Sequence, residues 1–260
     1  MIVTIDVGLK NLAMCIMSAE TANNLETYKI HLLDVYNTLE PEPSVCKGLL
    51  KSGELCGNKA MYKYAQPTLV GDTETHYTCK KHFPKDINIT ERNKLKTKKV
   101  DDFLLQDITL IVILKLREIF EQNKELFTQV TKVFIELQPK INAKMKLVSH
   151  IIYGEFVRYY HDNKKGTMVR FVRAATKLRA YTGPVIECKL KGAYAKRKWL
   201  SIQYTKWILK NKFNTSESQK WLPIIETHTK ADDLCDCFCY AVNVLHGIPK
   251  TKDKKGKCIK

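Results

Sequence analysis

Carboxylates interrupt three of the most apolar stretches of this chain, and this limits the folds that the chain can adopt. Asp6 lies in Ile-Val-Thr-Ile-Asp-Val-Gly, and Glu136 lies in Val-Phe-Ile-Glu-Leu. Asp232, Asp233 and Asp236 open a third stretch, Lys-Ala-Asp-Asp-Leu-Cys-Asp, near the C-terminus. A carboxylate in a buried strand is costly unless it is paired or binds a metal. We therefore expect these acids to form one common site.

Carboxylate oxygens at strand ends and on one helix face are ligands that suit Mg²⁺. Asp233 and Asp236 are three positions apart, so they share a helix face. Two metals held about 4 Å apart can activate a water and stabilise the leaving oxygen of a phosphodiester. Taken singly, Asp6 is as well explained by a turn, and Asp232 or Asp233 by an ordinary helix N-cap. The set as a whole favours a metal site.

The pattern of apolar residues predicts an α/β domain with a mixed central sheet. Strands are expected at residues 2–7, 12–18 and 28–36, joined by short connections as in an antiparallel meander. A helix capped by Asp101 or Asp102 should run to about Phe127, with Ile108, Ile111, Val112, Lys115 and Ile119 on one stripe. Further strands are expected at 130–137 and 167–172, and further helices from Pro139 to about 160, at 194–213 and at 230–246.

Residues 41–84 interrupt this pattern and are predicted to be an inserted module, followed by a basic connector at 85–100. The insert holds Cys46, Cys56 and the Cys-Lys-Lys-His segment of Cys79 and His82. Thiolate and imidazole ligands in a group of four are typical of a structural zinc site. His76 is an alternative ligand, and reduced cysteines with unrelated roles are the competing explanation.

Nine cysteines, an odd number, argue against a disulfide framework. Cys235, Cys237 and Cys239 lie in an apolar helix and are interpreted as small core residues. The longest apolar runs are far shorter than the about 20 residues that span a bilayer. Since Met1 leads directly into the first strand, no signal peptide is expected, and an intracellular location is predicted.

Lysine and arginine number 44 against 27 acids, a formal charge of +17, which favours a polyanionic partner. The basic residues gather at 170–179 and 189–198, where Tyr181, Tyr194 and Trp199 are interleaved with them. Aromatic rings can stack on unpaired bases, although core packing explains Trp199, Tyr204 and Trp207 as well. The tail, 249–260, carries six lysines and is expected to be disordered. The predicted DNA contacts are Lys10, Lys140, Lys144, Arg173, Lys177, Arg179, Lys196, Arg197 and Lys198.

Three motifs in order resemble those of RuvC-like Holliday junction resolvases, most closely the enzymes of poxviruses and other large DNA viruses. They are Ile-Asp-Val-Gly-Leu-Lys-Asn-Leu-Ala around Asp6, Ile-Glu-Leu-Gln-Pro around Glu136, and Lys-Ala-Asp-Asp-Leu-Cys-Asp-Cys-Phe near the C-terminus. The resemblance covers the chain except residues 41–100 and the tail. It implies a ribonuclease H-like nuclease domain at 1–40 and 101–248. The catalytic metal ligands would be Asp6, Glu136, Asp233 and Asp236. Asp232 is an extra acid, and a one-residue shift of the motif would exchange its role with that of Asp233.

The resemblance further implies an endonuclease that cuts four-way DNA junctions with two Mg²⁺ ions, which Mn²⁺ can replace. It implies a homodimer and a viral protein working in the cytoplasm, in a viral factory, or in the nucleus of an infected cell. The helix after Glu136 is the predicted dimer interface, through Met145, Val148, Ile151, Ile152 and Phe156, and packing of these residues on the sheet is the alternative. A ribonuclease H acting on RNA–DNA hybrids and a non-catalytic, zinc-containing nucleic-acid-binding protein are the alternatives.

Overall fold

The computed structural model describes residues 1–38, 45–67, 73–90, 92–95, 102–138 and 141–246. The chain divides into two compact units, one made of Met1–Thr38 with Leu105–Lys260 and the other of Leu39–Leu104. We refer to the first as the nuclease-like unit, after the motifs that resemble those of the resolvase family, and to the second as the module. Lys140, one of the predicted DNA contacts, lies outside the described residues, as does the C-terminal tail.

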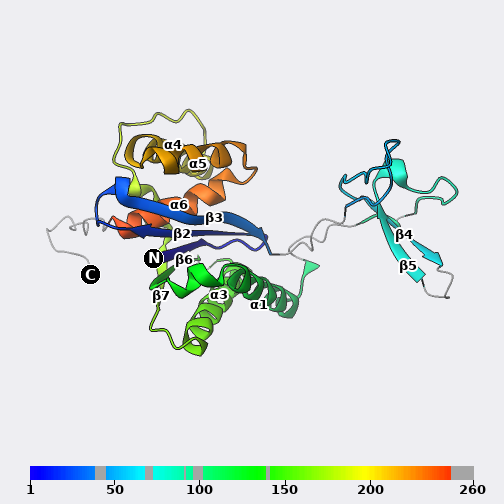
Figure 1. The fold of residues 1–260 in the computed structure, drawn as a ribbon, viewed down its shortest axis with the longest axis horizontal. Coiled ribbons are helices and arrows are strands. Elements are labelled where there is room, and N and C mark those ends of the chain that lie inside the picture. The colour runs from blue at the N-terminus through cyan, green and yellow to red at the C-terminus, as the bar shows by residue number, and fades with distance from the viewer. Residues whose placement is uncertain (39–44, 68–72, 91, 96–101, 139–140, 247–260) are drawn as a thin grey trace. The chain divides into compact units, whose positions relative to one another are not determined.

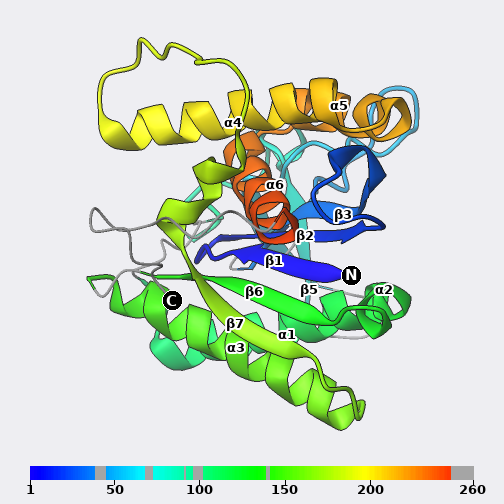
Figure 2. The ribbon, with the colours of Figure 1, turned by 90° about the vertical axis from the view of Figure 1, so that its left-hand side faces the viewer.

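The nuclease-like unit is built on one five-stranded sheet of order β3-β2-β1-β6-β7 (Figure 2). The strands β1 (Ile2–Asp6), β2 (Asn11–Ala19) and β3 (Tyr28–Asn37) form the expected antiparallel meander. The strands β6 (Lys132–Leu137) and β7 (Met168–Arg173) extend the sheet parallel to β1. This mixed sheet, flanked by helices, confirms the predicted fold class, and its element order is the one expected of a ribonuclease H-like fold.

Helices cover both faces of the sheet (Figure 1). The helices α1 (Leu105–Gln122), α2 (Lys124–Thr128) and α3 (Ala143–Asp162) belong to one layer, and α4 (Ala193–Lys212), α5 (Thr215–Thr227) and α6 (Ala231–Leu245) belong to the other. The short 3₁₀ segment η1 (Leu25–Thr27) lies between β2 and β3, and η4 (Ala174–Ala180) follows β7 before α4. None of the helices in the described part of the chain has the length and apolarity that crossing a bilayer requires.

The helix α6 lies between the sheet and the α4–α5 pair, and nine successive residues from Leu234 to Val242 are buried. A helix that is surrounded on all sides must be apolar all round. This explains why Cys235, Cys237 and Cys239 are all fully buried although they cannot share one helix face. They are small core residues, as predicted.

The structure corrects several boundaries. The helix α1 begins at Leu105, not at an aspartate cap, and its buried stripe includes Leu116 and Phe120 but not Ile111 or Lys115. It ends before Asn123, which leaves helical geometry and donates its side-chain amide to the Ile119 carbonyl at 3.0 Å.

The helix α5 was not anticipated as a separate element. The buried Glu217 explains its position. Glu217 accepts hydrogen bonds from the Ile30 backbone N–H at 2.9 Å and from the Trp221 indole at 3.1 Å, and so fastens α5 to β3.

In the module, the hairpin β4 (Tyr62–Pro67) and β5 (Thr73–Thr78) is followed by η2 (Lys80–His82). The predicted connector is not separate from it. The Lys63 N–H donates to the Asn93 carbonyl at 2.7 Å, and the Leu95 N–H donates to the Met61 carbonyl at 2.9 Å. Residues 92–95 therefore pair with β4 and belong to the module.

Candidate active site

The sheet places Asp6 and Glu136 side by side. In the parallel pair of β1 and β6, Ile5 lies opposite Ile135, so the next residue of each strand is at the same level. Strand alternation turns Thr4 and Asp6 toward α6. The Thr4 hydroxyl donates to the Cys237 carbonyl at 2.9 Å, and the Asp6 N–H donates to the Cys237 sulfur at 3.0 Å. The two carboxylates therefore meet the buried helix at the carboxyl ends of their strands.

Glu136 is almost buried, and four groups stabilise its charged form, namely Asp6, Lys177, Tyr240 and Gln138. The Tyr240 hydroxyl donates to Oε1 at 3.1 Å, and the Gln138 amide donates to Oε2 at 3.0 Å. Burial opposes ionisation, but hydrogen bonding by Asp6, the positive charge of Lys177 and these two donors hold the pKa of Glu136 below its usual value. Of the pair, Glu136 is therefore the carboxylate whose charged form the surroundings favour.

Asp6 has the opposite tendency. Burial raises its pKa well above the usual value, and the hydrogen bond to Glu136 and the negative charge of Glu136 raise it further. Lys177 acts against this shift without cancelling it. The surroundings therefore move the pKa values of these two neighbouring carboxylates apart, that of Asp6 upward and that of Glu136 downward.

Lys177, from η4, supplies a positive charge at the centre of the acidic group. Its Nζ lies 4.0 Å from Asp6 Oδ1 and 3.8 Å from Glu136 Oε1, and it forms an ion pair with Asp236 Oδ2. Burial would lower the pKa of Lys177, but the charges of Asp6, Asp236 and Glu136 raise it. The other oxygen of Asp236, Oδ1, is buried and has no hydrogen-bond partner among the residues that the structure describes. The structure thus brings Asp6, Glu136 and Asp236 around one cation.

Asp232 and Asp233 form a second, more exposed half of the site at the start of α6. Lys198 from α4 forms an ion pair with Asp232 and lies 3.7 Å from Asp233 Oδ1. Burial acts to raise the pKa of Asp232, but the hydrogen bond and charge of Lys198 outweigh burial and lower that pKa. Burial and the charge of Asp232 raise the pKa of Asp233, and the charge of Asp236 contributes to this increase. Asp233 and Asp236 are three positions apart on α6, so they lie on one face of the helix.

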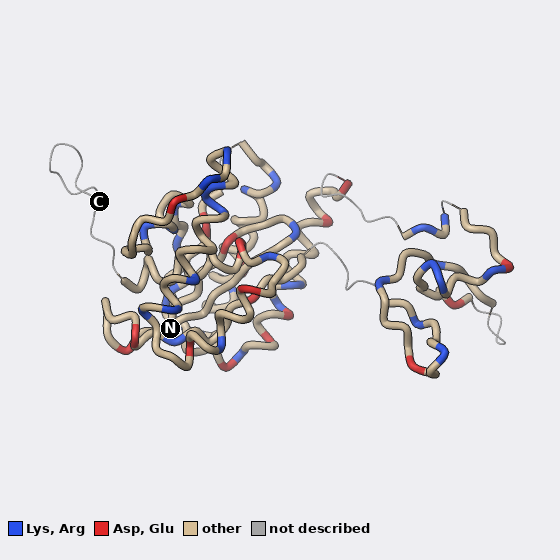
Figure 3. The backbone as a smooth tube through the Cα atoms, turned by 90° about the horizontal axis from the view of Figure 1, so that it is seen from above, with Lys and Arg blue, Asp and Glu red and all other residues tan. Residues whose placement is uncertain are grey.

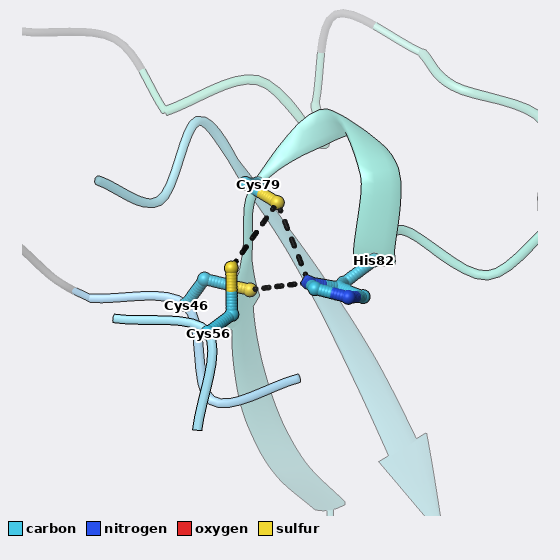
Figure 4. Close-up of side chains that lie close together, drawn as sticks. All are labelled: Cys46, Cys56, Cys79 and His82. Atoms are coloured by element: carbon cyan, nitrogen blue, oxygen red, sulfur yellow. Dashed lines mark hydrogen bonds between the residues drawn. The ribbon is translucent and has the colours of Figure 1, made fainter. Parts of the chain in front are cut away.

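The cysteine–histidine cluster of the module is more tightly gathered than the acids (Figure 4). Among the described residues, it is the group whose ligand atoms all lie within 4.8 Å of one another. His82 Nδ1 is 3.4 Å from Cys46 Sγ and 3.5 Å from Cys79 Sγ, and Cys56 Sγ is 4.0 Å from Cys79 Sγ. The structure therefore brings together the four predicted ligands.

Local backbone geometry fits this cluster to a metal. Burial acts to raise the pKa of Cys79, but the backbone N–H groups of His82 and Lys81 outweigh burial and lower that pKa to about 7. This favours the thiolate form of Cys79. A Cβ at Gly48 would come within 2.5 Å of the His82 ring, so only glycine fits there. The alternative ligand, His76, instead stacks on Tyr64 with ring centroids 5.2 Å apart.

The predicted DNA contacts fall into two groups. Lys177 and Lys198 lie on the carboxylates described above and not on the open surface. Lys144 is half-buried, and the remaining described residues are exposed, namely Lys10, Arg173, Arg179, Lys196 and Arg197.

Of the three aromatic residues considered for base stacking, Tyr194 is the exposed one. Tyr181 stacks on Tyr204 with centroids 3.8 Å apart and has Trp207 at its edge, so its ring is already used in packing. Trp199 is half-buried, whereas Tyr194 is 65% exposed. The Tyr194 ring lies 5.2 Å from Lys198 Nζ, next to the acidic site.

Sequence reasoning missed the partners of Glu136. Gln138 lies two positions further along the chain from Glu136, and Tyr240 lies four residues after Asp236, on the same face of α6. Both spacings were visible in the sequence, but neither residue type signals a site by itself. The position of Lys177 among the acids depends on the path of η4, which no local pattern specifies.

Comparison with known proteins gives distant similarities. No family model matches the chain. An uncharacterized protein of Acanthamoeba polyphaga mimivirus is 27% identical over 240 residues, covering 87% of this chain. The chain spans 55% of the length of that relative.

Among solved structures, the chain is similar to the fowlpox virus Holliday junction resolvase, with 13% identity, a TM-score of 0.44, and coverage of 95% of this chain and 99% of that one. It is similar to the yeast mitochondrial Holliday junction resolvase Ydc2, with 14% identity, a TM-score of 0.43, and coverage of 94% and 78%. It is similar to Thermus thermophilus RuvC, with 11% identity, a TM-score of 0.41, and coverage of 95% of this chain and 96% of that one. Since these TM-scores lie below 0.5, a functional assignment has to rest on the chain's own residues.

Proposed function

We propose that this chain is a metal-dependent endonuclease of the RuvC-like type that resolves four-way DNA junctions. The observation that carries the proposal is the meeting of three almost buried carboxylates, Asp6, Glu136 and Asp236, around one cationic group. A buried set of this kind serves no packing purpose and is costly without a cation. The three motifs around these acids are those that resemble the resolvase family. By the same resemblance, we place the activity in viral genome processing, in the cytoplasm or nucleus of an infected cell.

The acidic residues fit a divalent cation. Asp236 Oδ1 is a buried oxygen that lacks a partner, and Lys177 already supplies positive charge to the same oxygens that Mg²⁺ or Mn²⁺ would take. Asp6, Glu136, Asp233 and Asp236 would hold the metal, with Asp232 beside them. When bound, two such ions supply an activated water and stabilise the leaving oxygen of the phosphodiester.

The remaining residues of the site orient the acids and bind the backbone. Tyr240 and Gln138 fix both oxygens of Glu136, so its carboxylate points in one direction. Lys177 and Lys198 keep their protons and stand at the two halves of the acidic set, where each can also meet a phosphate. Exposed basic groups next to them would hold the neighbouring phosphates, namely Arg173, Arg179, Lys196 and Arg197.

Tyr194 supplies a surface for an unpaired base. It is exposed, it lies beside Lys198, and every base has a flat face on which an aromatic ring can stack. Unpaired or strained bases occur at the branch point of a junction and not in plain duplex. This placement favours branched DNA over an RNA–DNA hybrid.

We further propose a homodimer, because two symmetric nicks require two sites related by a two-fold axis. The interface cannot use the full set predicted on α3. Three of its residues, Val148, Ile152 and Phe156, are buried within the protomer. The ring of Phe156 packs on that of Phe120, with ring centroids 5.0 Å apart. The partly exposed Met145 and Ile151 remain available. Sedimentation of the protein with and without junction tests the dimer, and a monomer under both conditions would exclude it.

In the module, we propose that Cys46, Cys56, Cys79 and His82 bind one structural Zn²⁺. Cysteine and imidazole ligands gathered in a group of four are typical of closed structural zinc sites. The small core of the module supplies little stability of its own, which is the usual reason for such a site.

The deciding experiment compares four-way junction, RNA–DNA hybrid and flap substrates, side by side, with Mg²⁺. We expect paired nicks in the junction and little cutting of the others. Preferential cutting of the hybrid would identify a ribonuclease H. Binding of all three without cutting, in Mg²⁺ or Mn²⁺, would identify the non-catalytic alternative.

A further inference from the structure

The module carries an excess of exposed positive charge that the proposed nuclease chemistry does not use. Its described residues include nine cations, all exposed, and four acids, Glu54, Glu74, Asp86 and Asp102 (Figure 3). Glu74 lies 3.7 Å from His76, and Glu54 accepts a hydrogen bond from Ser52 at 3.3 Å. The cations are Lys47, Lys51, Lys59, Lys63, Lys80, Lys81, Lys85, Arg92 and Lys94. Apart from Lys94, none of them pairs with a carboxylate within the described ranges.

The ligand cluster draws several of these cations together. Lys47 follows Cys46 directly, and Lys80 and Lys81 lie between Cys79 and His82. Because the four ligand atoms lie within 4.8 Å of one another, the backbone segments that bear these lysines are neighbours. The Lys47 N–H also donates to the Tyr77 carbonyl at 3.4 Å, which brings this segment to the edge of β5.

The two faces of the hairpin carry different side chains. Tyr62 and Tyr64 point to Phe83, with centroids 5.4 and 5.7 Å apart, so they lie on the packed face. Strand alternation turns their neighbours to the other side. Lys63 and Tyr77 are directly opposite each other in the register and share that face. Lys63 is exposed and Tyr77 is half-buried, so an ammonium group and an aromatic ring stand side by side on it.

We propose that this face of the module binds single-stranded nucleic acid, with Tyr77 stacking on a base and Lys63 contacting a phosphate. Lys47, Lys80 and Lys81 extend the positive surface along the strand. Aromatic platforms in a positively charged groove are how single strands are held without sequence preference. This function is independent of the nuclease site and requires no cutting.

The module also exposes Leu49, Leu50 and Leu55, which would suit a protein partner instead. We favour nucleic acid because an apolar protein surface would leave the unpaired cations of the module without counter-charge. A phosphate backbone supplies that charge and releases counterions when it binds.

The test uses the full chain carrying Glu136→Gln, so that no strand is cut. Oligonucleotides containing 5-iodouracil are photo-cross-linked to it, and the adducts are located by mass spectrometry after trypsin digestion. We expect an adduct in the peptide of residues 64–80, which contains Tyr77 and is bounded by Lys63 and Lys80. This readout separates the module from the nuclease-like unit without any mutation in the module.

Variants then measure the two side chains separately. Tyr77→Ala should weaken single-strand binding by about tenfold, while Tyr77→Phe should leave it unchanged because the ring is kept. Lys63→Ala should flatten the log–log salt dependence by about 0.7. The matched control is Lys132→Ala, an exposed lysine at the opposite end of β6 from Glu136, which should change neither quantity. Zinc content measured for each variant shows that the module is intact.

The proposal is overturned if the adducts fall only in the nuclease-like unit while Tyr77→Ala and Tyr77→Phe bind equally well. It is also overturned if single-strand binding survives Lys63→Ala and Tyr77→Ala but is lost with the pair Leu49→Ser and Leu55→Ser. That result would assign the binding surface of the module to its exposed leucines, Leu49 and Leu55.

Discussion

The acidic group and the cysteine–histidine cluster are both suited to metals, but they are held in different ways. The acids come from β1, β6 and α6, elements far apart in the sequence, and Lys177 joins them from η4. Each of these elements has its own place in a large core. The cysteine–histidine ligands come from residues 46–82, in a unit with few buried apolar side chains, among them Ala60, Tyr62 and Phe83.

The difference indicates in which of the two units folding depends on metal binding. In the nuclease-like unit, strand pairing and the apolar core hold the elements that carry the acids, and Lys177 and Lys198 compensate the carboxylates. In the module the ligands are themselves much of what links the turn around Cys46 to η2. Metal binding is then coupled to folding, as it is in small zinc domains. Removing metal should therefore unfold one site and leave the other in place.

Zinc removal is the largest effect that we expect. Cys79→Ala, or a zinc-selective chelator, should release about one zinc per chain and unfold residues 45–95, because structural zinc contributes on the order of 10 kcal/mol in small domains. Hydrogen exchange followed by mass spectrometry should show loss of protection in β4 and β5 and full protection in β1 and β6. Loss of protection in both units would mean that the module supports the sheet, and the contrast would be broken.

Replacement of a carboxylate is the next largest effect. Loss of a residue that only hydrogen-bonds to a metal ligand costs up to roughly 100-fold in activity. Because Glu136→Gln removes a proposed ligand itself, we expect junction cutting to fall by more than that, while junction affinity changes little. The basic residues that hold phosphate are untouched, and the glutamine keeps the shape of the side chain. Single-turnover cutting and gel-shift affinity, measured on the same preparation, check this. Cutting at the wild-type rate in Mg²⁺ would remove Glu136 from the active site.

A smaller effect is expected at the hydrogen-bond partner of Glu136. Tyr240→Phe keeps the ring packed in the core but removes the donor to Oε1. We expect cutting to fall by roughly 10- to 100-fold, with a weaker apparent affinity for Mg²⁺. Tyr160→Phe is the matched control, since its buried hydroxyl has no hydrogen-bond partner. Equal activity of the two variants would show that the orientation of Glu136 does not depend on Tyr240.

Much of the fold, but only part of the site, was predictable from sequence. The meander and the acids at the ends of β1 and β6 follow from short apolar segments in which a carboxylate is conspicuous. The helix α5 was missed because its anchor, Glu217, is a buried acid bonded to a distant strand. The α3 residues Val148 and Ile152 were assigned to a dimer because a sequence does not show how many faces of a helix its neighbours cover.

The smallest effect concerns the stability of the metal-free protein and has opposite signs in the two halves of the acidic site. Burial and Glu136 raise the pKa of Asp6, so the folded chain binds that proton more tightly than the unfolded chain. Stability from this group is present below the unfolded pKa and is lost as pH rises through the folded pKa. Asp6→Asn cannot ionise, so above that range the metal-free variant should melt a few degrees higher than wild type.

Asp232 provides the matched comparison. Lys198 outweighs burial and lowers the pKa of Asp232, so the stability from this group is present above the unfolded pKa and is lost as pH falls through the folded one. Asp232→Asn should therefore melt lower than wild type at neutral pH, and the gap should close in acid. Mg²⁺ should raise the melting temperature of wild type but not of Asp6→Asn, because only the former binds it well. If both metal-free variants shift in the same direction at neutral pH, the acids do not form two electrostatically distinct halves, and Lys177 and Lys198 do not divide the site in the way described.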